Sequence, residues 1–282
     1  MTQSRATLLG FGAVLLWSTL ALFTATSAPI PPFQLTAMTF AVGGTLGLLW
    51  SASRGTLAHL TRVPIKVYAF GTIGLFGYHA LYFAALRLAP PAQAGLVAYL
   101  WPLLIVLFSG LLPGETLKRG HIIGASLGFA GAALLVVDTL GPLSSKAPWG
   151  LAIAFLCALT WSGYSVLSRR FKDAPTDAVG VYCLASSALA IVAHLAFEIS
   201  VLPSTTNVLS VLGLGLGPVG LAFFVWDIGV KQGNIAHLGT LSYAAPILST
   251  GLLVIFGISA ATLSLAGATI LIALGAFVAA KA

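Results

Sequence analysis

The sequence predicts an all-α membrane protein with ten transmembrane helices, arranged as two inverted five-helix repeats. Composition, the length of the apolar segments and an internal repeat carry this prediction. Of the 282 residues, 59% are hydrophobic and 7% are charged, whereas about 25% of residues are charged in a typical soluble protein. So few charged side chains cannot cover the surface of a water-soluble protein, but a lipid bilayer accepts the apolar surface that remains.

The composition also argues against several functions. The net charge of +7 reflects a scarcity of acids, since 13 Lys and Arg accompany only 6 Asp and Glu. The basic residues are scattered over short loops, which argues against a nucleic-acid partner. Cys157 and Cys183 lie within apolar stretches, which is typical of packed thiols and not of a disulfide framework. The sequence holds no zinc-ligand cluster, phosphate-binding loop or nucleophile elbow, so it predicts no enzyme, cofactor or metal.

Ten apolar segments result when the chain is divided at prolines, glycine clusters and charges. A hydrocarbon core of about 30 Å requires about 20 helical residues, and each segment has that length. The segments are 6–26, 33–52, 66–86, 91–111, 120–138, 148–168, 177–197, 207–230, 234–256 and 261–280. Runs such as GAALLVV are apolar at every position, which excludes the alternation of a β-barrel. The first segment is alternatively a secretory signal, but its long apolar run favours a retained helix.

The placement of Lys and Arg predicts that both termini are cytoplasmic. With the N-terminus inside, eleven basic residues fall in cytoplasmic segments, and only Arg87 and Lys146 fall outside. Short loops rich in Lys and Arg stay on the cytoplasmic side of the membrane. An even number of spans agrees with this orientation, because Arg5 and Lys281 then lie on the same side.

An offset of 144 residues brings unusual residues of the two halves into register. The coinciding pairs are Trp17 and Trp161, Ser18 and Ser162, Arg87 and Lys231, Gly95 and Gly239, Tyr99 and Tyr243, and Pro102 and Pro246. We therefore predict two domains, 1–143 and 144–282, with five helices each. Because five is odd, the second half enters the membrane with opposite polarity. Inverted repeats are typical of secondary transporters with one midplane site; the alternative is a duplication retained for packing.

Four motifs extend this interpretation: ATLLGFGAVLLWST at residue 6, YLWPLL at 99, GETL at 114 and WDIGVKQGN at 226. Together they resemble the drug/metabolite transporter superfamily with two EamA-type repeats, and the chain is most similar to the bacterial aromatic amino acid exporters. The similarity covers essentially the whole chain. It implies a multi-pass protein of the bacterial inner membrane. The second half reads GISAAT where the first reads GETL, so Glu115 has no counterpart.

Aromatic residues at mid-membrane depth are the candidate substrate-binding residues. A tyrosine hydroxyl or indole N–H in hydrocarbon needs a partner, so these rings face either a water-filled cavity or one another in an aromatic core. The candidates are Trp17, Tyr78, His79, Tyr82, Tyr99, Trp101, Trp161 and Tyr243. His79 is a functional candidate because it titrates near mid-membrane, and the alternative is a neutral histidine bonded to a nearby carbonyl.

A second group of residues predicts places where helices bend or gates close. Prolines lack the N–H that closes a helical turn, and glycines weaken a helix or allow close packing. The candidates are Pro102, Pro246, Gly217, Pro218 and Asp227. Asp227 with Lys231 is alternatively a structural i,i+4 pair, and Glu115 is expected to start the fifth span. Gly124 and Gly128 form a GxxxG packing motif, and we expect a monomer, although packing across a dimer remains open.

The resemblance therefore implies an exporter of aromatic amino acids or similar bulky metabolites that works by alternating access. No acid lies at mid-depth in the sequence, which favours facilitated transport over ion coupling. The partners expected are a small-molecule substrate and the lipid bilayer. The alternatives are a broader exporter of amino acids or drugs, a non-transporting membrane scaffold, and a membrane-embedded lipid-modifying enzyme.

Overall fold

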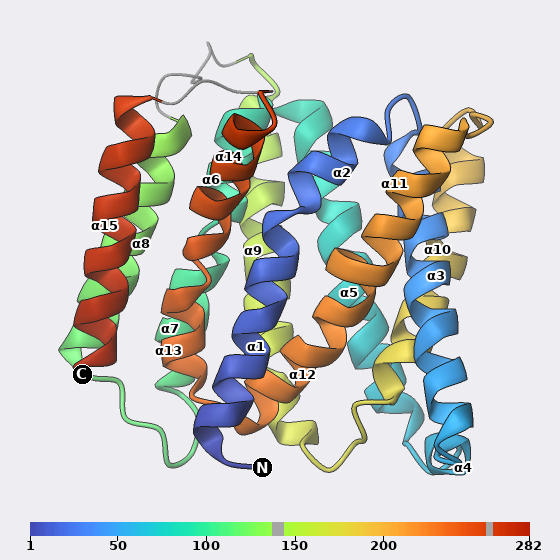
Figure 1. Ribbon diagram of the computed structural model, residues 1–282, viewed down its shortest axis with the longest axis horizontal. Coiled ribbons are helices and arrows are strands. Elements are labelled where there is room, and N and C mark those ends of the chain that lie inside the picture. Colours follow the sequence, from blue (N-terminus) through green and yellow to red (C-terminus); the bar gives the residue numbers. More distant parts are fainter. Residues whose placement is uncertain (137–143, 258–261) are drawn as a thin grey trace.

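The computed structural model describes residues 1–136, 144–257 and 262–282, which form a bundle of helices that run roughly along a common direction (Figure 1). Both termini lie toward the same end of the bundle (Figure 1). We call this the terminal end and the opposite one the far end. Within the described ranges every regular element is helical and none is a strand.

The helices of the two halves follow the predicted segments closely. The first half contains α1 (Gln3–Ser18), α2 (Leu20–Thr26), α3 (Pro32–Ser53), α4 (Leu57–Leu60), α5 (Ile65–Leu88), α6 (Pro91–Ala98), α7 (Trp101–Ser109) and α8 (Arg119–Val136). The second half contains α9 (Ala147–Leu167), a 3₁₀ turn (Ser168–Phe171), α10 (Ala178–Phe197), α11 (Thr205–Leu216), a π-helical segment (Gly217–Leu221), α12 (Ala222–Gln232), α13 (Ile235–Leu241), α14 (Ala244–Ile255) and α15 (Leu263–Ala280).

Nine helical segments of the described chain are long and apolar enough to cross a membrane, and a tenth, shorter apolar helix covers Gln93–Ser109. Each coincides with one of the ten predicted segments to within a few residues, which confirms the predicted fold class. Residues 137, 138 and 261, at the ends of two predicted segments, lie outside the described residues. Residue 143 also lies outside the described residues, so the domain boundary predicted between residues 143 and 144 stays a prediction.

The first half packs against the second, helix by helix. The main contacts pair α1 with α12, α3 with α10, α5 with α9, and α8 with α15. The GxxxG motif serves the last of these pairs, because a Cβ atom added to Gly124 would collide with the carbonyl oxygen of Gly275. Only glycine permits this approach of two helix backbones. The motif therefore packs two helices within one chain.

Four spans are interrupted near mid-membrane, and in the eighth span the interruption is the π-helical segment Gly217–Leu221. The fourth breaks at Tyr99–Leu100, between α6 and α7, and the ninth breaks at Ser242–Tyr243, between α13 and α14. Each break lies just before Pro102 or Pro246, so the prolines occupy the first turn of a new helix and do not kink a continuous one. The first turn tolerates proline because its N–H groups have no helical partner. The first span breaks at Thr19, between α1 and α2.

The predicted orientation can be tested by cysteine labelling. In a chain without Cys157 and Cys183, cysteines at positions 58 and 174, both at the terminal end, should react with a membrane-impermeant maleimide only from the cytoplasm. A cysteine at the exposed position 146 should react only from outside. Labelling of position 58 or 174 from outside would overturn the orientation.

Replacing Pro102 and Pro246 together with alanine should slow transport several-fold while the protein still folds. Alanine supplies an N–H at each break, which can bond to the carbonyl four residues earlier and extend the helix through the break. The initial rate of uptake into liposomes measures transport, and the thermal unfolding midpoint measures the stability of the protein. Pro91→Ala, at the exposed start of α6, is the matched control. An unchanged rate in the double variant would contradict a gating role.

Candidate functional site

Four tryptophans from four helices meet in the middle of the bundle. Trp17 comes from α1, Trp101 from α7, Trp161 from α9 and Trp226 from α12. All six pairs are in ring contact, with centroids between 5.0 Å for Trp17 and Trp226 and 6.4 Å for Trp101 and Trp161. We call these four residues the tryptophan cluster.

Two hydrogen bonds orient the rings of this cluster. The indole N–H of Trp17 donates to the carbonyl of Pro218, at 2.9 Å, and that of Trp226 donates to the hydroxyl of Ser165, at 3.1 Å. Pro218 and Gly217 belong to the π-helical segment that interrupts the eighth span. Single π-helical turns are frequent at functional sites. Pro218, which was predicted to let this span bend, therefore contacts the tryptophan cluster directly.

Three tyrosines lie beside the cluster. Tyr78 and Tyr82 project from α5 and stack on each other at 6.2 Å, and Tyr78 also contacts Trp161 at 5.4 Å. Tyr99 lies at the break between α6 and α7 and contacts Trp101 at 6.4 Å. Each phenol hydroxyl can donate a hydrogen bond to water or to a solute.

His79, also on α5, lies among aromatic rings. Its Nδ1 lies 2.8 Å from the carbonyl oxygen of Leu75. A carbonyl only accepts hydrogen bonds, so Nδ1 donates, and in the neutral imidazole Nε2 is then an acceptor. The ring contacts Phe40 at 5.1 Å and Phe223 at 6.4 Å. Sequence reasoning identified the carbonyl partner as one alternative, and the open Nε2 leaves the functional alternative standing as well.

Tyr243 occupies a different environment from the other candidates. Its side chain is fully buried beside Val106 and Ala125, and its hydroxyl accepts a hydrogen bond of 3.2 Å from the backbone N–H of Leu103. That N–H lies in the first turn of α7, where the break of the helix leaves it without a backbone partner. Tyr243 thus supports the broken helix from outside the tryptophan cluster.

A polar network closes the terminal end. Arg169, in the 3₁₀ turn, bonds to the carboxylate of Glu115 and to the backbone carbonyls of Val230 and Gly233 at the end of α12. The turn, the segment before α8 and the end of α12 are thereby tied together. Glu115 was expected to start the fifth span, but its partner is Arg169. Sequence reasoning missed this pair because its members are 54 residues apart.

Asp227 is held in a second group of contacts at the same end. Its carboxylate lies 2.9 Å from the ammonium of Lys231 and accepts a hydrogen bond of 2.7 Å from the hydroxyl of Thr176. Lys231 also donates to the carbonyl of Ala174, at 3.1 Å. The predicted i,i+4 pair is therefore present, and it also connects the end of α12 to the segment before α10.

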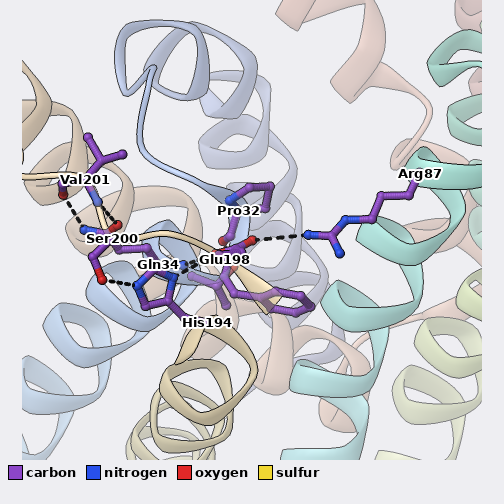
Figure 2. A network of polar contacts seen from close by, with 9 residues as sticks. Pro32, Gln34, Arg87, His194, Glu198, Ser200 and Val201 are labelled. Carbon is purple, nitrogen blue, oxygen red and sulfur yellow. Dashed lines mark hydrogen bonds and ion pairs between the residues drawn. The ribbon is translucent and has the colours of Figure 1, made fainter. Parts of the chain in front are cut away.

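The far end carries its own polar network around Glu198 (Figure 2). The Glu198 carboxylate accepts hydrogen bonds of 3.0–3.1 Å from the backbone N–H groups of Phe33 and Gln34, at the start of α3. His194 contacts the same carboxylate at 3.0 Å, and Arg87 approaches it to 3.8 Å. An acid is favourable at a helix N-terminus, so Glu198 joins α10 to α3.

Two cavities open at the surface of the described chain, away from the cluster. One, of about 340 Å³, lies between α1 and α13 and includes Thr7, Asn234 and His237. The other, of about 330 Å³, lies between α3 and α10 and includes Gln34, Ser187 and His194. Neither includes a member of the tryptophan cluster.

Comparison with known proteins identifies relatives over the full length of the chain. The aromatic amino acid exporter YddG of Ancylobacter novellus is 52% identical over 281 residues, which cover 99% of this chain and 98% of the relative. The aromatic amino acid exporter YddG of Salmonella typhimurium is 26% identical, covering 89% of this chain and 88% of the relative. A solved structure titled "Crystal structure of protein" is 51% identical, covers 99% of both chains and superposes with a TM-score of 0.95.

A family model also matches the chain, and it does so twice. The model of the EamA-like transporter family matches residues 4–137 and again residues 148–280. The two matched regions correspond to the two sets of five spans, and the relatives are transporters, not enzymes. This multi-pass membrane protein therefore belongs to the EamA-like transporter family.

Proposed function

We propose that the protein exports aromatic amino acids across the bacterial inner membrane by alternating access. The observation that carries this proposal is the tryptophan cluster, which has three tyrosines beside it in the middle of the bundle. The 52% identity to an exporter whose name specifies aromatic amino acids supports the same substrate class. Cytoplasmic termini, predicted from the basic residues, set the direction of export from the terminal end to the far end.

The chemistry of the site matches both parts of such a substrate. Aromatic pairs contribute about 0.5–1.5 kcal/mol beyond the burial of area, so an aromatic side chain gains by displacing one indole of the cluster and contacting the others. The substrate carboxylate can accept hydrogen bonds from the hydroxyls of Tyr78, Tyr82 and Tyr99. Its ammonium can donate to Nε2 of His79. We leave Tyr243 out of this lining because its hydroxyl already has a partner.

The ends of the bundle support weak, reversible binding. Among the described residues, the ion pairs lie at the terminal end or the far end, where Arg169, Lys231 and Arg87 each have a carboxylate partner. No fixed charge therefore faces the substrate at mid-depth, and its charged groups are bound by neutral donors, acceptors and water. Since none of the acids in the described ranges lies unpaired at mid-depth to carry a coupling ion, facilitated transport is the mechanism that we propose.

Replacing Tyr99 or Trp101 with alanine should lower the transport of phenylalanine and tryptophan more than that of threonine. Each substitution removes ring contacts that only an aromatic substrate uses, with an expected decrease of about tenfold, close to the upper end of the energy of one aromatic pair. Uptake by purified protein in liposomes measures all three substrates. Trp149→Ala, on an exposed indole, is the control. An equal decrease for all three would assign these rings to packing.

His79→Phe should lower phenylalanine transport about tenfold and leave that of 3-phenylpropanoate, which lacks the amino group, nearly unchanged. A hydrogen bond to a charged group contributes about 1.5–3 kcal/mol, and phenylalanine at position 79 cannot accept one. His79→Gln, which keeps an acceptor, should recover part of the rate. The control Phe40→Leu changes the packing of His79 and should affect both substrates alike. If His79→Phe lowered the transport of both substrates alike, the proposed contact between the substrate ammonium and His79 would be refuted.

A further inference from the structure

The third span of each half ends in a cation, and the two cations occupy equivalent positions. Arg87 lies at the end of α5 and Lys231 lies 144 residues later, at the end of α12. Since the halves are inverted, Arg87 is at the far end and Lys231 at the terminal end. Arg87 approaches Glu198, whose carboxylate binds the start of α3, and Lys231 contacts the segment before α10.

The connection at the terminal end is tight. Lys231 contacts the carboxylate of Asp227 at 2.9 Å and the carbonyl of Ala174 at 3.1 Å, and its side chain is only 4% exposed. Asp227 is bonded in turn to Thr176. Two buried, directly bonded side chains therefore fasten the end of α12 to the segment that leads into α10.

The equivalent connection at the far end is loose. Figure 2 shows Arg87 extended toward Glu198, with the other partners of that carboxylate gathered on the opposite side. The distance of 3.8 Å exceeds that of a hydrogen bond, and the Arg87 side chain is 54% exposed. Ile30, which is equivalent to Ala174 by the 144-residue offset, offers the corresponding carbonyl, but Arg87 makes no hydrogen bond to it here.

The backbones of the two halves also differ at equivalent spans. The third span of the first half, α5, is continuous, whereas its equivalent is interrupted by the π-helical segment Gly217–Leu221. The first span of the first half is broken at Thr19, whereas its equivalent, α9, continues through the corresponding position. Two halves with related sequences thus adopt two different conformations in one molecule.

We propose that Lys231 and Arg87 are alternating latches of the transport cycle. In transporters with inverted repeats, exchange of the conformations of the halves produces the opposite state. After this exchange Arg87 contacts the Ile30 carbonyl and the Glu198 carboxylate closely and fastens the far end, while Lys231 releases the terminal end. The inference rests on the alternating access proposed above, but it is independent of the identity of the substrate.

The proposal requires the two latches to stabilise opposite states. Loss of a contact that exists in only one state shifts the population toward the other. Removing Lys231 alone would leave Asp227 as an unpaired buried charge, which is strongly destabilising. The variant Asp227→Asn/Lys231→Gln removes the ion pair without that charge. Arg87→Gln tests the far end, and Arg62→Gln, on an exposed cation without an ion pair in the described chain, is the control.

The experiment measures distances between nitroxide spin labels in the liposome-reconstituted protein, in a chain without its native cysteines. Labels at 172 and 232 report on the terminal end, and labels at 28 and 91 report on the far end; all four positions are exposed. The double variant should increase the population with a separated terminal end by about fivefold or more, the lower range of typical coupling energies. Arg87→Gln should decrease that population, and Arg62→Gln should leave it unchanged.

Opposite shifts in the two variants support the latches, because a merely structural loss would move both in one direction. Shifts in the same direction, or no shift in either variant, would overturn the proposal. Uptake of phenylalanine by the unaltered protein in the same liposomes tests the proposed function separately. If uptake occurs and the shifts do not, only the latches are refuted; if uptake is absent, the proposed function fails by itself.

Discussion

The free energy required to place a charge in hydrocarbon determines how this molecule is organised. Charged side chains are costly at the middle of a bilayer, and the described ion pairs gather at the two ends of the bundle. The middle is left to neutral groups, among them indoles, phenols, the Ser165 hydroxyl and the His79 imidazole. The same constraint separates the proposed substrate contacts, at mid-depth, from the ion pairs that connect helices, at the two ends.

The apolar segments and the repeat could be predicted from the sequence because each depends on local composition. A run of about 20 apolar residues has few alternatives to a spanning helix, and its boundaries follow from the prolines and charges that flank it. The three tryptophans predicted at mid-depth do meet. Trp226 was missed as a member of the cluster because Asp227 beside it indicated the end of a span. Only the fold reveals that the indole points inward while the carboxylate bonds to Thr176.

Contacts between distant segments could not be predicted in this way. Arg169 has no local pattern that indicates Glu115 or the carbonyls of α12, and it was counted only as a basic residue of a cytoplasmic loop. Tyr99 and Tyr243 share the same Tyr-x-x-Pro context, yet the Tyr243 hydroxyl accepts a bond from the Leu103 N–H, whereas the Tyr99 ring contacts Trp101. The repeat predicts that equivalent residues of the two halves make equivalent contacts. A transporter held in one state has different contacts in its two halves. The differences between the halves are thus a property of the conformation and not of the sequence alone.

The pairing of helices across the halves bears on how such a protein originates. The main partner of α3 is α10, that of α5 is α9, and that of α8 is α15, so helices of the first half bury their faces largely against the second. A half-length chain on its own would leave these faces uncovered. A single repeat could cover them only with a second, inverted copy. Two copies within one chain can carry different residues at equivalent positions, and Glu115, which has no equivalent in the second half, is an example.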